Sequence, residues 1–344
     1  MIEPHDILYI NVSRIGDTLL ATPAIRAVAN RWPNAKIHAL AHPGRETVLH
    51  HLPFIHRVGV INKQRARFMG HLSAKHYDLA FVCNFDPPLI NYALRVARHV
   101  VAFRQPDESL NKRLFASAEH PGNRNAHAVD VQLLLPAALQ IPPVEKSLCY
   151  RVTDEEIRWA AQFLAERKIN QRHPLIGLQI ASFPTKAFRD WPVSHFAELC
   201  HRVKQVWPGS HFLIFGGSLE TPRTLELAAH LGESATHCAG QLSLRETGAL
   251  MNGLDAYVGV DTGPTHLMGA LHRPMLVMYH GYLPGRIAWP LDHPCSISVE
   301  HPLADQCGPD ESIAAITVDR VWEQLKPLIA NAGLVSSPAS IGVK

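Results

Sequence analysis

The sequence of 344 residues predicts an α/β protein made of two Rossmann-like, doubly wound domains. The length exceeds what one hydrophobic core usually serves, so two domains are expected. Short apolar runs alternate with amphipathic helical segments along most of the chain, and this alternation stops once and then restarts. Such alternation is typical of parallel sheets that are covered by helices on both faces.

The first domain is predicted over residues 1–150. Its opening strand, residues 7–12, is rich in β-branched residues and leads through a polar loop into an amphipathic helix over residues 18–32. Pro23 is tolerated there because it lies near the first turn. The other expected elements are strands at 35–42, 57–62, 78–84 and 99–104 and helices at 45–52, 89–98 and 127–139.

Residues 151–173 combine a charged helix with a polar stretch and are predicted to link the domains. A second domain is expected over residues 174–330, followed by a tail at 331–344. Its strands are expected at 174–181, 211–217, near 235–240, 256–260 and 274–281, and its helices at 193–207, 221–231, 243–253, 265–272 and 317–333. Two doubly wound domains make the cleft between them the expected ligand site.

Charge is unevenly distributed along the chain. Residues 1–150 hold 17 Lys and Arg against 11 Asp and Glu, a net charge of +6, whereas the remaining residues hold 16 against 19, a net charge of −3. A basic half can attract an anionic partner or a membrane face. A modest fluctuation of surface charge explains the numbers equally well.

Cysteine usage and hydropathy indicate the compartment. The six cysteines are scattered without a CxxC pair, which argues against a zinc knuckle or a disulfide framework and is typical of reduced thiols in the cytosol. The N-terminus lacks the features of a signal peptide. No apolar run reaches the ~18–20 residues of a membrane span. We therefore expect a soluble, cytoplasmic protein, which leaves attachment to a membrane surface open.

The strongest candidate site is the segment VGVDTGPTHLMGAL, residues 258–271. A buried strand carries Asp261 to its C-terminal end, and the chain then turns directly into a helix. The free N–H groups of a helix N-terminus favour an anion, and Gly263 allows close approach of the backbone. The side chains that can add donors are those of Thr262, Thr265 and His266. A diphosphate site is favoured over simple helix capping.

The second candidate is INVSRIGDTLLATPAI, residues 10–25, where a strand ends in a polar loop. Asp17 stands where the next helix begins. A carboxylate at this edge of the sheet can act as a general base, but Asp is also a preferred N-cap, and the residues alone leave the two interpretations equal. The loop lacks the GxGxxG spacing of a dinucleotide fingerprint.

The third candidate is the loop SFPTKAFRDWP, residues 182–192, which again follows a buried strand. A solvated basic turn is the alternative to a phosphate site here. The position at the C-terminal end of a strand favours the phosphate site, where an arginine offers a bidentate fork. The candidate phosphate-binding side chains are Ser182, Thr185, Lys186 and Arg189.

Two weaker features complete the candidates. In FGGSLET, residues 215–221, Glu220 can accept hydrogen bonds from ribose hydroxyls, although an acidic residue in a first helical turn is equally plausible. Two clusters of basic residues can hold an anionic acceptor, or can simply form an exposed polar face. These clusters are Lys63, Arg65 and Arg67, and Lys112, Arg113 and Arg124.

The two main segments together resemble glycosyltransferase family 9, the ADP-heptose:lipopolysaccharide heptosyltransferases. Shorter segments keep the family order, and the resemblance covers about residues 5–330. These segments are HAVDVQLLL at 127–135, WP at 191–192, FGGSLE at 215–220 and AGQLSLRE at 239–246.

The resemblance implies a GT-B fold, in which two Rossmann-like domains face a cleft, with the acceptor on the first domain and the sugar nucleotide on the second. It implies an inverting transfer of heptose from ADP-L-glycero-β-D-manno-heptose to a Kdo or heptose hydroxyl of the lipopolysaccharide inner core. The enzyme would work on the cytoplasmic face of the inner membrane as a peripheral protein. No nucleic acid partner is expected.

The resemblance also implies roles for particular residues. Asp17 matches the general base that deprotonates the acceptor hydroxyl. The donor diphosphate and ribose site matches Asp261, Thr262, Gly263 and His266. Glu220 matches the acidic residue that binds the nucleoside, Thr185 a phosphate-contacting hydroxyl, and Leu242 an apolar position in the adenine pocket.

One position departs from the family pattern. Two residues before WP the family usually carries a lysine that neutralises the departing phosphate, but Arg189 stands here, and its fork differs in shape and reach. Lys186 is the alternative for this role. The family needs no metal, no DxD motif is present, and no cofactor is expected, so positive donors would stabilise the leaving group. Cys295 and Cys307 do not reproduce the cysteine cluster of an iron-containing subgroup.

Three alternatives to this function remain open at this point. The diphosphate motif reads neither base nor sugar, so a GT-B enzyme could use another sugar nucleotide. A sugar-nucleotide epimerase would need paired acids, for which Glu220 and Asp261 are candidates. A non-catalytic nucleotide-binding protein is weakly disfavoured by the ionisable Asp17.

Overall fold

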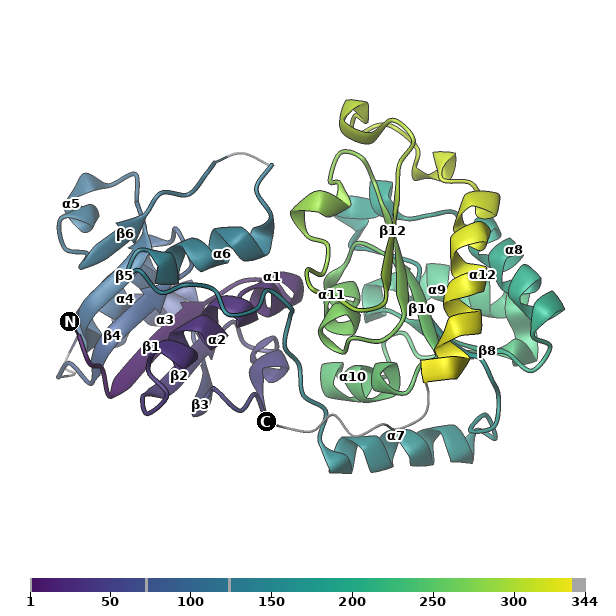
Figure 1. Ribbon diagram of the computed structural model, residues 1–344, viewed down its shortest axis with the longest axis horizontal. Coiled ribbons are helices and arrows are strands. Elements are labelled where there is room, and N and C mark those ends of the chain that lie inside the picture. Colours follow the sequence, from purple (N-terminus) through teal and green to yellow (C-terminus); the bar gives the residue numbers. More distant parts are fainter. Residues whose placement is uncertain (1, 72–73, 123–124, 336–344) are drawn as a thin grey trace. The chain divides into compact units, whose positions relative to one another are not determined.

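The computed structural model describes residues 2–71, 74–122 and 125–335 and divides into two compact units (Figure 1). Unit 1 consists of the described residues up to Arg151 together with Arg286–Asp292. Unit 2 consists of Val152–Gly285 and the described residues from His293 onward. No helix in the described part of the chain is long and apolar enough to cross a membrane.

Unit 1 is built on a six-stranded sheet in the order β3-β2-β1-β4-β5-β6, and every strand pairing in it is parallel. Its strands are β1 (Asp6–Asn11), β2 (Lys36–Ala41), β3 (Arg57–Val60), β4 (Tyr77–Val82), β5 (Ala97–Phe103) and β6 (Ala116–Ala118). Its α-helices are α1 (Ile15–Leu20), α2 (Thr22–Arg31), α3 (Lys63–Phe68), α4 (Pro87–Val96), α5 (Glu108–Asn111) and α6 (Ala128–Ala137), and a 3-10 turn covers Glu46–Leu49.

Unit 2 repeats this architecture with a parallel sheet in the order β12-β11-β10-β7-β8-β9. Its strands are β7 (Leu175–Gln179), β8 (His211–Phe215), β9 (Ala235–His237), β10 (Ala256–Val260), β11 (Met275–Tyr279) and β12 (Ser296–Glu300). Its α-helices are α7 (Asp154–Glu166), α8 (Val193–Val206), α9 (Thr221–Leu231), α10 (Leu244–Asn252), α11 (Gly263–Ala270) and α12 (Val318–Val335). Short 3-10 turns cover Pro184–Arg189, Ser218–Glu220, Gly232–Ser234, Ala304–Gln306 and Ile313–Ala315.

Both sheets therefore have the same strand order, read as 3-2-1-4-5-6 within each unit. The order reverses between the first and fourth strands, which are β1 and β4 in unit 1 and β7 and β10 in unit 2. Ligands of such sheets bind beyond the carboxyl ends of the strands at this switch point. The prediction of two Rossmann-like, doubly wound α/β domains is confirmed, and each sheet has one expected ligand-binding edge.

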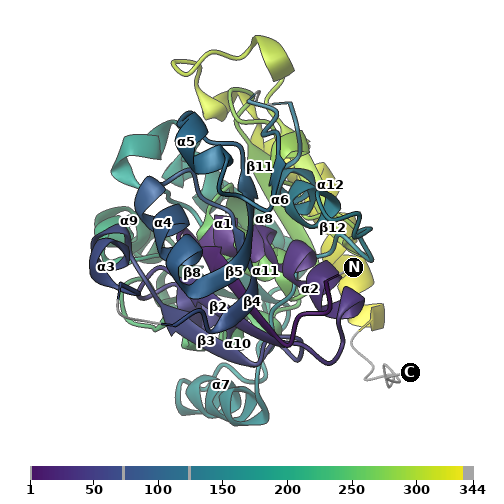
Figure 2. The same ribbon diagram turned by 90° about the vertical axis from the view of Figure 1, so that its left-hand side faces the viewer.

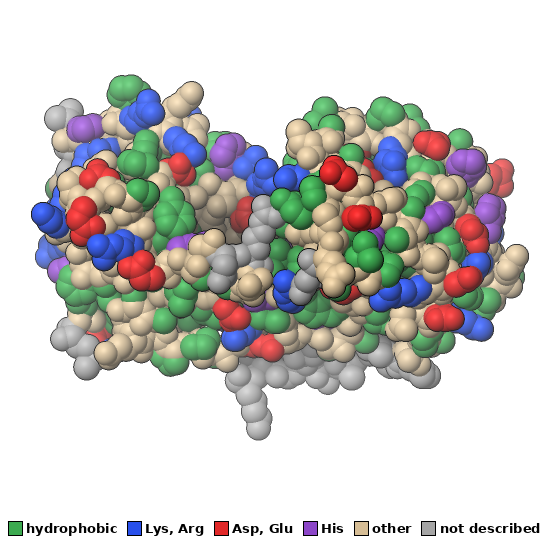
Figure 3. All heavy atoms as spheres, turned by 90° about the horizontal axis from the view of Figure 1, so that it is seen from above, with side chains coloured by type: hydrophobic (Ala, Val, Ile, Leu, Met, Phe, Trp, Pro, Cys, Tyr) green, Lys and Arg blue, Asp and Glu red, His purple; other side chains and the backbone are tan. Residues whose placement is uncertain are grey.

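The apolar runs form the central strands because both faces of each sheet are covered. In unit 1, α2 packs on α6 and α3 packs on α4; in unit 2, α8 packs on α9 and α12, and α10 packs on α7. Leu8 and Ile10 of β1 lie in the core of unit 1, and Val258 and Val260 of β10 lie in that of unit 2. The surface seen in Figure 3 carries acidic and basic side chains interspersed with hydrophobic ones.

The first predicted helix is interrupted in the structure. α1 already begins at Ile15 and ends at Leu20, and α2 starts afresh at Thr22. Pro23 lies in the first turn of α2, where its missing N–H costs no hydrogen bond, but it cannot continue the ladder of α1. The helix predicted over 45–52 is only the short 3-10 turn. The strands β6 and β12 were not predicted, because these short segments show no clear apolar pattern.

Two segments belong to other units than the sequence predicts. The charged helix α7, predicted within the linker, belongs to unit 2, where Glu156 forms an ion pair with Arg245 at 2.6 Å. Residues 286–292 belong to unit 1. His127 Nε2 donates to the Trp289 carbonyl oxygen at 2.7 Å, and the backbone N–H of Lys146 donates to the Asp292 carboxylate at 2.9 Å.

Candidate functional site

The junction of β10 and α11 forms the centre of the candidate site in unit 2. Gly259 leaves room for the Tyr257 ring, because a Cβ at Gly259 would lie 2.7 Å from the Tyr257 hydroxyl. That hydroxyl lies 2.8 Å from Thr265 Oγ1, which donates to the Val260 carbonyl oxygen at 2.6 Å. Thr265 thus fixes the turn and is buried, whereas Thr262, the N-cap of α11, makes no capping hydrogen bond.

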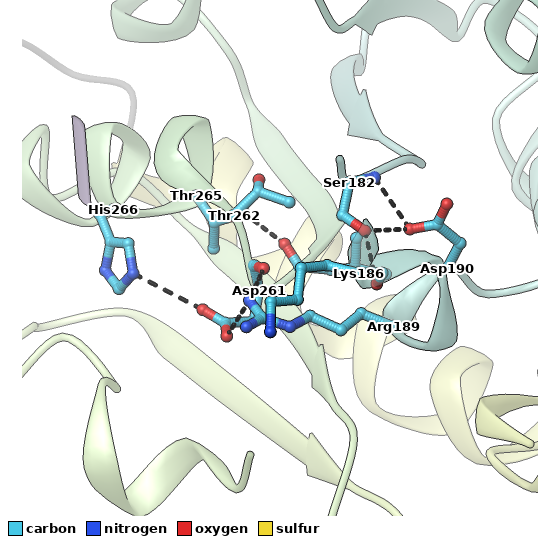
Figure 4. A network of polar contacts seen from close by, with 9 residues as sticks. Ser182, Lys186, Arg189, Asp190, Asp261, Thr262, Thr265 and His266 are labelled. Atoms are coloured by element: carbon cyan, nitrogen blue, oxygen red, sulfur yellow. Dashed lines mark hydrogen bonds and ion pairs between the residues drawn. The ribbon is translucent and has the colours of Figure 1, made fainter. Parts of the chain in front are cut away.

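Asp261 lies between a basic side chain from another loop and a histidine from the helix that follows it, α11 (Figure 4). Arg189 Nη1 donates to the carboxylate and to the carbonyl oxygen of Asp261, both at 2.8 Å. His266 Nε2 lies 3.5 Å from the other carboxylate oxygen. The loop after β7 is thereby held against the start of α11. The carboxylate binds these two basic groups rather than capping the helix.

The charges around Asp261 determine its protonation. Burial by itself would raise the pKa of Asp261, but the hydrogen bond with His266 and the positive charges of Arg189 and His266 outweigh it and lower the pKa below 3.8. The carboxylate is therefore ionised at neutral pH, and it compensates part of the positive charge gathered there. Pro264 has no N–H, so the first turn of α11 can offer an anion the backbone N–H groups of Gly263 and Thr265, which helix geometry leaves without partners inside the helix.

This lowered pKa makes part of the stability of unit 2 dependent on pH. Because the folded-state pKa lies below the unfolded-state value of 3.8, the ionised carboxylate stabilises the fold above that value, and this contribution is lost as the pH falls through the folded-state pKa. In urea titrations we expect Asp261→Asn to be less stable than the wild type at pH 7, with the difference shrinking below pH 3.8. A difference that stayed constant down to the lowest measurable pH would contradict the assignment, and Asp154→Asn on exposed α7 serves as control.

The loop after β7, residues 182–190, is closed at its base by a hydrogen-bonded pair. The backbone N–H of Ser182 donates to Asp190 Oδ1 at 2.8 Å, and the Ser182 hydroxyl lies 2.7 Å from the same oxygen and 2.8 Å from the Lys186 carbonyl oxygen. Burial raises the pKa of Asp190, partly offset by Ser182 and by the charges of Arg223 and Arg189. Ser182 thus shapes the loop instead of pointing a free hydroxyl at a ligand.

Two substitutions separate the shape of this loop from its charge. Asp190→Ala removes both hydrogen bonds, which together stabilise the shape of the loop by about 2 kcal/mol. We expect the affinity for ADP, the nucleotide expected here, to fall about tenfold, because part of this stabilisation is lost from the binding-competent loop. Asp190→Asn keeps an acceptor oxygen for Ser182, and we expect affinity near that of the wild type by calorimetry. Equal losses in both variants would assign the effect to the Asp190 charge instead.

Thr185, Lys186 and Arg189 lie on the 3-10 turn of this loop, and their exposure differs. Thr185 is exposed, Lys186 is half-buried with its ammonium 5.8 Å from the Phe188 ring, and Arg189 reaches Asp261. Arg189 Nε is buried without a protein partner among the described residues. Arg189 therefore retains donor capacity for a further anion after binding Asp261.

Two more loops reach the same edge of the sheet. Glu220, in the turn after β8, is half-buried and accepts a hydrogen bond from the backbone N–H of Gly217. Burial raises its pKa; the Gly217 bond lowers it and the nearby Asp190 charge raises it further. Gly240 has a φ of 71° and lies close to this turn, because a Cβ built on it would be 3.1 Å from the Ser218 Cα. Leu242, two residues further along the chain, is half-buried. A side chain at Gly240 would push the loops apart.

Unit 1 places Asp17 at its own switch point, directly after β1. Asp17 lies in the first turn of α1, whose N-cap is Arg14, so it is not the cap that sequence patterns also allowed. Its carboxylate is exposed and has no hydrogen bond or ion pair within the described part of the chain. The preceding loop is held by Asn84, which exchanges hydrogen bonds with the Val12 backbone at 2.9 and 3.1 Å. Asp17 is thus an unpartnered carboxylate at the start of a helix whose preceding loop is held in place.

The basic clusters are only partly free. Lys63 pairs with Asp86 at 2.5 Å, whereas Arg65 and Arg67 are exposed on α3. Arg113 donates to Asn91 of α4, against which α3 packs, so the two clusters lie on neighbouring elements. Arg124 lies outside the described residues.

No group of three or more His, Cys, Asp or Glu side chains suited to a metal ion occurs among the described residues. Asp261 and Glu220, the pair considered for epimerase chemistry, have separate partners: Arg189 and His266 for Asp261, and Gly217 for Glu220.

Residues that sequence reasoning missed include Asp190, Asn84 and Arg223. Asp190 lies within the predicted phosphate-binding loop, residues 182–192, but nothing in the sequence indicated that its side chain would be buried.

Comparisons with known proteins point to one family of transferases. The model of Glycosyltransferase family 9 (heptosyltransferase) matches residues 65–312. Lipopolysaccharide heptosyltransferase 2 of Salmonella typhimurium is 26% identical, and the match covers 95% of this chain and 99% of that protein. A glycosyl transferase family 9 structure from Veillonella parvula has a TM-score of 0.82 at 16% identity, covering 95% and 97% of the two chains. E. coli ADP-heptose lps heptosyltransferase II has a TM-score of 0.79 at 22% identity, covering 95% and 99%.

Proposed function

The chain belongs to glycosyltransferase family 9, and on that premise we propose that it transfers a heptose from ADP-heptose to the inner core of lipopolysaccharide. The acceptor is a Kdo or heptose hydroxyl of that core. The names of the similar proteins, lipopolysaccharide heptosyltransferase 2 among them, support the substrate pair. The enzyme works on the cytoplasmic face of the inner membrane as a peripheral protein.

The observation that carries the donor assignment is the contact of Arg189 with Asp261 at the start of α11. It brings a guanidinium with unused donors beside the free first-turn N–H groups of a helix, at the switch point of the sheet. A diphosphate carries the matching negative charge. Glu220 and Leu242, on the neighbouring loops, contribute a carboxylate for the ribose and an apolar contact for the adenine.

Catalysis requires a base and a stabilised leaving group. In the proposed step, the Asp17 carboxylate takes the proton of the acceptor hydroxyl, and the freed oxygen attacks the anomeric carbon of the heptose. The bond from that carbon to the diphosphate oxygen breaks at the same time, ADP leaves with the electron pair, and the configuration inverts. Arg189, the first-turn N–H groups and the nearby Lys186 stabilise the charge that develops on the leaving phosphate, so no metal ion is needed.

The acceptor is placed on unit 1, which carries Asp17. The inner core of lipopolysaccharide is anionic, and the exposed guanidiniums of Arg65 and Arg67 can bind its carboxylate or phosphate groups. Lys63 contributes less, because Asp86 already neutralises it.

Two measurements test the proposal in sequence. Calorimetry of the purified protein with ADP, UDP, GDP and NAD, without metal, is expected to give binding of ADP that weakens in His266→Ala. Transfer from ADP-heptose to a core acceptor is then measured by mass spectrometry, with EDTA present. Preference for UDP or GDP would overturn the donor assignment and favour another sugar nucleotide. Loss of transfer on adding EDTA would overturn the metal-free mechanism.

A further inference from the structure

One surface of unit 1 exposes large apolar side chains between basic ones. Phe68 ends α3 with 81% of its surface exposed, and the adjacent Met69 is 43% exposed. Arg65 and Arg67, on the same short helix, are exposed as well. Adjacent large apolar side chains exposed to water, with cations beside them, are a combination found at interaction sites.

The surface continues across α4 to the chain that follows α5. Arg95 of α4 donates from Nε to the Met69 carbonyl oxygen at 3.0 Å, and its neighbour Arg113 donates to Asn91 of α4 at 3.1 Å. In both ribbon views α4 lies between α3 and α5 (Figures 1 and 2). We call this surface the α3–α5 patch. It consists of Arg65, Arg67, Phe68, Met69, Arg95, Lys112, Arg113 and Phe115.

The α3–α5 patch has a surplus of positive charge. Two acidic side chains at its margins are paired with cations, Asp86 with Lys63 and Glu108 with Arg104. Asp107, which is hydrogen-bonded to Ser109, offsets one of the remaining positive charges. Arg65, Arg67 and Arg113 form no ion pair with any acidic side chain that the structure describes. Lys112 is exposed beside Glu108, and Phe115 beyond it is 48% exposed. The patch therefore presents cations around protruding apolar groups.

This combination of groups discriminates between possible partners. An anionic bilayer attracts the cations to its headgroups and receives apolar side chains at the boundary of the acyl chains. A second copy of the chain would bring like charges together. Phosphate groups of a sugar acceptor would satisfy the arginines but offer nothing for Phe68 and Met69.

We propose that the α3–α5 patch docks the protein on an anionic lipid bilayer, with Phe68 and Met69 inserted at the interface and the exposed Lys112 and Arg113 on lipid phosphates. The proposal rests on the peripheral membrane association stated under the proposed function and names the surface responsible. Docking through this face attaches unit 1, the unit that carries Asp17, to the membrane that holds the acceptor.

The test is co-sedimentation of the full chain with vesicles of phosphatidylglycerol and phosphatidylethanolamine, against vesicles of phosphatidylcholine. We expect binding to the anionic vesicles that weakens with salt. Phe68→Ser with Met69→Ser should weaken it about tenfold, because the apolar insertion is lost. Lys112→Gln with Arg113→Gln should weaken it about fivefold for each cation removed.

Matched controls lie on unit 2: Leu225→Ser, an exposed leucine of α9, and Arg158→Gln with Arg172→Gln, two exposed arginines. We expect these controls to bind like the wild type. Patch variants that bind like the controls, or wild-type binding that is equal on both kinds of vesicle, would overturn the proposal. Binding of the patch to an acidic protein, with no binding to either kind of vesicle, would overturn the proposal too.

A second measurement, heptose transfer to a soluble acceptor, separates failure of the docking proposal from failure of the proposed function. Transfer from ADP-heptose to a deacylated, water-soluble core acceptor needs no membrane, so Phe68→Ser with Met69→Ser should leave it unchanged. If the wild type fails in this soluble assay, the proposed function is wrong whatever the vesicles show. If soluble transfer is normal and only vesicle binding is insensitive to the patch variants, the docking surface alone is wrong.

Discussion

Asp17→Asn is expected to lower kcat for heptosyl transfer by about 10²–10⁴-fold while leaving the affinity for ADP unchanged. An amide has the same shape as the carboxylate but cannot take a proton from the acceptor hydroxyl, and general base catalysis contributes a factor of this size. The exposed position in the first turn of α1, with no partner among the described residues, means that the substitution breaks no contact of the fold. Steady-state kinetics and calorimetry measure the two effects separately.

Asp154→Asn is the matched control, because Asp154 is also an exposed carboxylate in the first turn of a helix, α7. It should leave both kcat and ADP affinity unchanged. Retention of wild-type kcat in Asp17→Asn would remove the general base from the mechanism. A loss of ADP affinity in that variant would show that Asp17 acts on donor binding instead.

Arg189→Met is expected to have the second large effect, and on two properties at once. Removal of a preorganised positive donor from a developing anion lowers kcat by about 10²–10³-fold. The same change leaves the buried Asp261 carboxylate without its 2.8 Å partner, and loss of one member of a buried pair costs about 3–5 kcal/mol. Transfer kinetics and urea unfolding of the purified variant give the two quantities.

Arg189→Lys tests how far the shape of the guanidinium matters. One ammonium can replace the charge, but it does not reproduce the pair of contacts to the carbonyl and carboxylate oxygens of Asp261 together with a free Nε. We expect an intermediate kcat. Arg202→Met, which breaks an exposed ion-pair network with Glu198 and Asp319, should change neither kcat nor stability appreciably. Unchanged kcat in Arg189→Met would assign the leaving-group role to Lys186.

The sequence allowed the family, the GT-B type of fold and the position of each candidate loop to be predicted, because these depend on local patterns. Strand ends at Asn11, Gln179 and Val260 are marked by apolar runs that stop at polar loops. Which strands lie side by side depends instead on contacts between distant segments. The meeting of Arg189 with Asp261, 72 positions along the chain, is therefore visible only in the structure.

Two local features could not be predicted from the sequence. In the structure the hydroxyl and the N–H of Ser182 are bound to Asp190, because a buried carboxylate must have partners, and the contact of Ser182 with phosphate stays a prediction. Asp190 looked like an ordinary polar loop residue, and only burial by the neighbouring loops gives it this role. The break between α1 and α2 at Ala21 was missed because a helix pattern does not reveal where its first turn begins.

The return of residues 286–292 to unit 1 has a consequence for biosynthesis. The contacts of Trp289 with His127 and of Asp292 with Lys146 join parts of unit 1 that are about 150 positions apart in the chain. When the first 151 residues have left the ribosome, unit 1 still lacks a piece that is made only after most of unit 2. Unit 1 therefore stays incompletely packed until translation passes residue 292. A chain that stops after Arg151 would expose the surface that residues 286–292 normally cover, and such an exposed surface promotes aggregation.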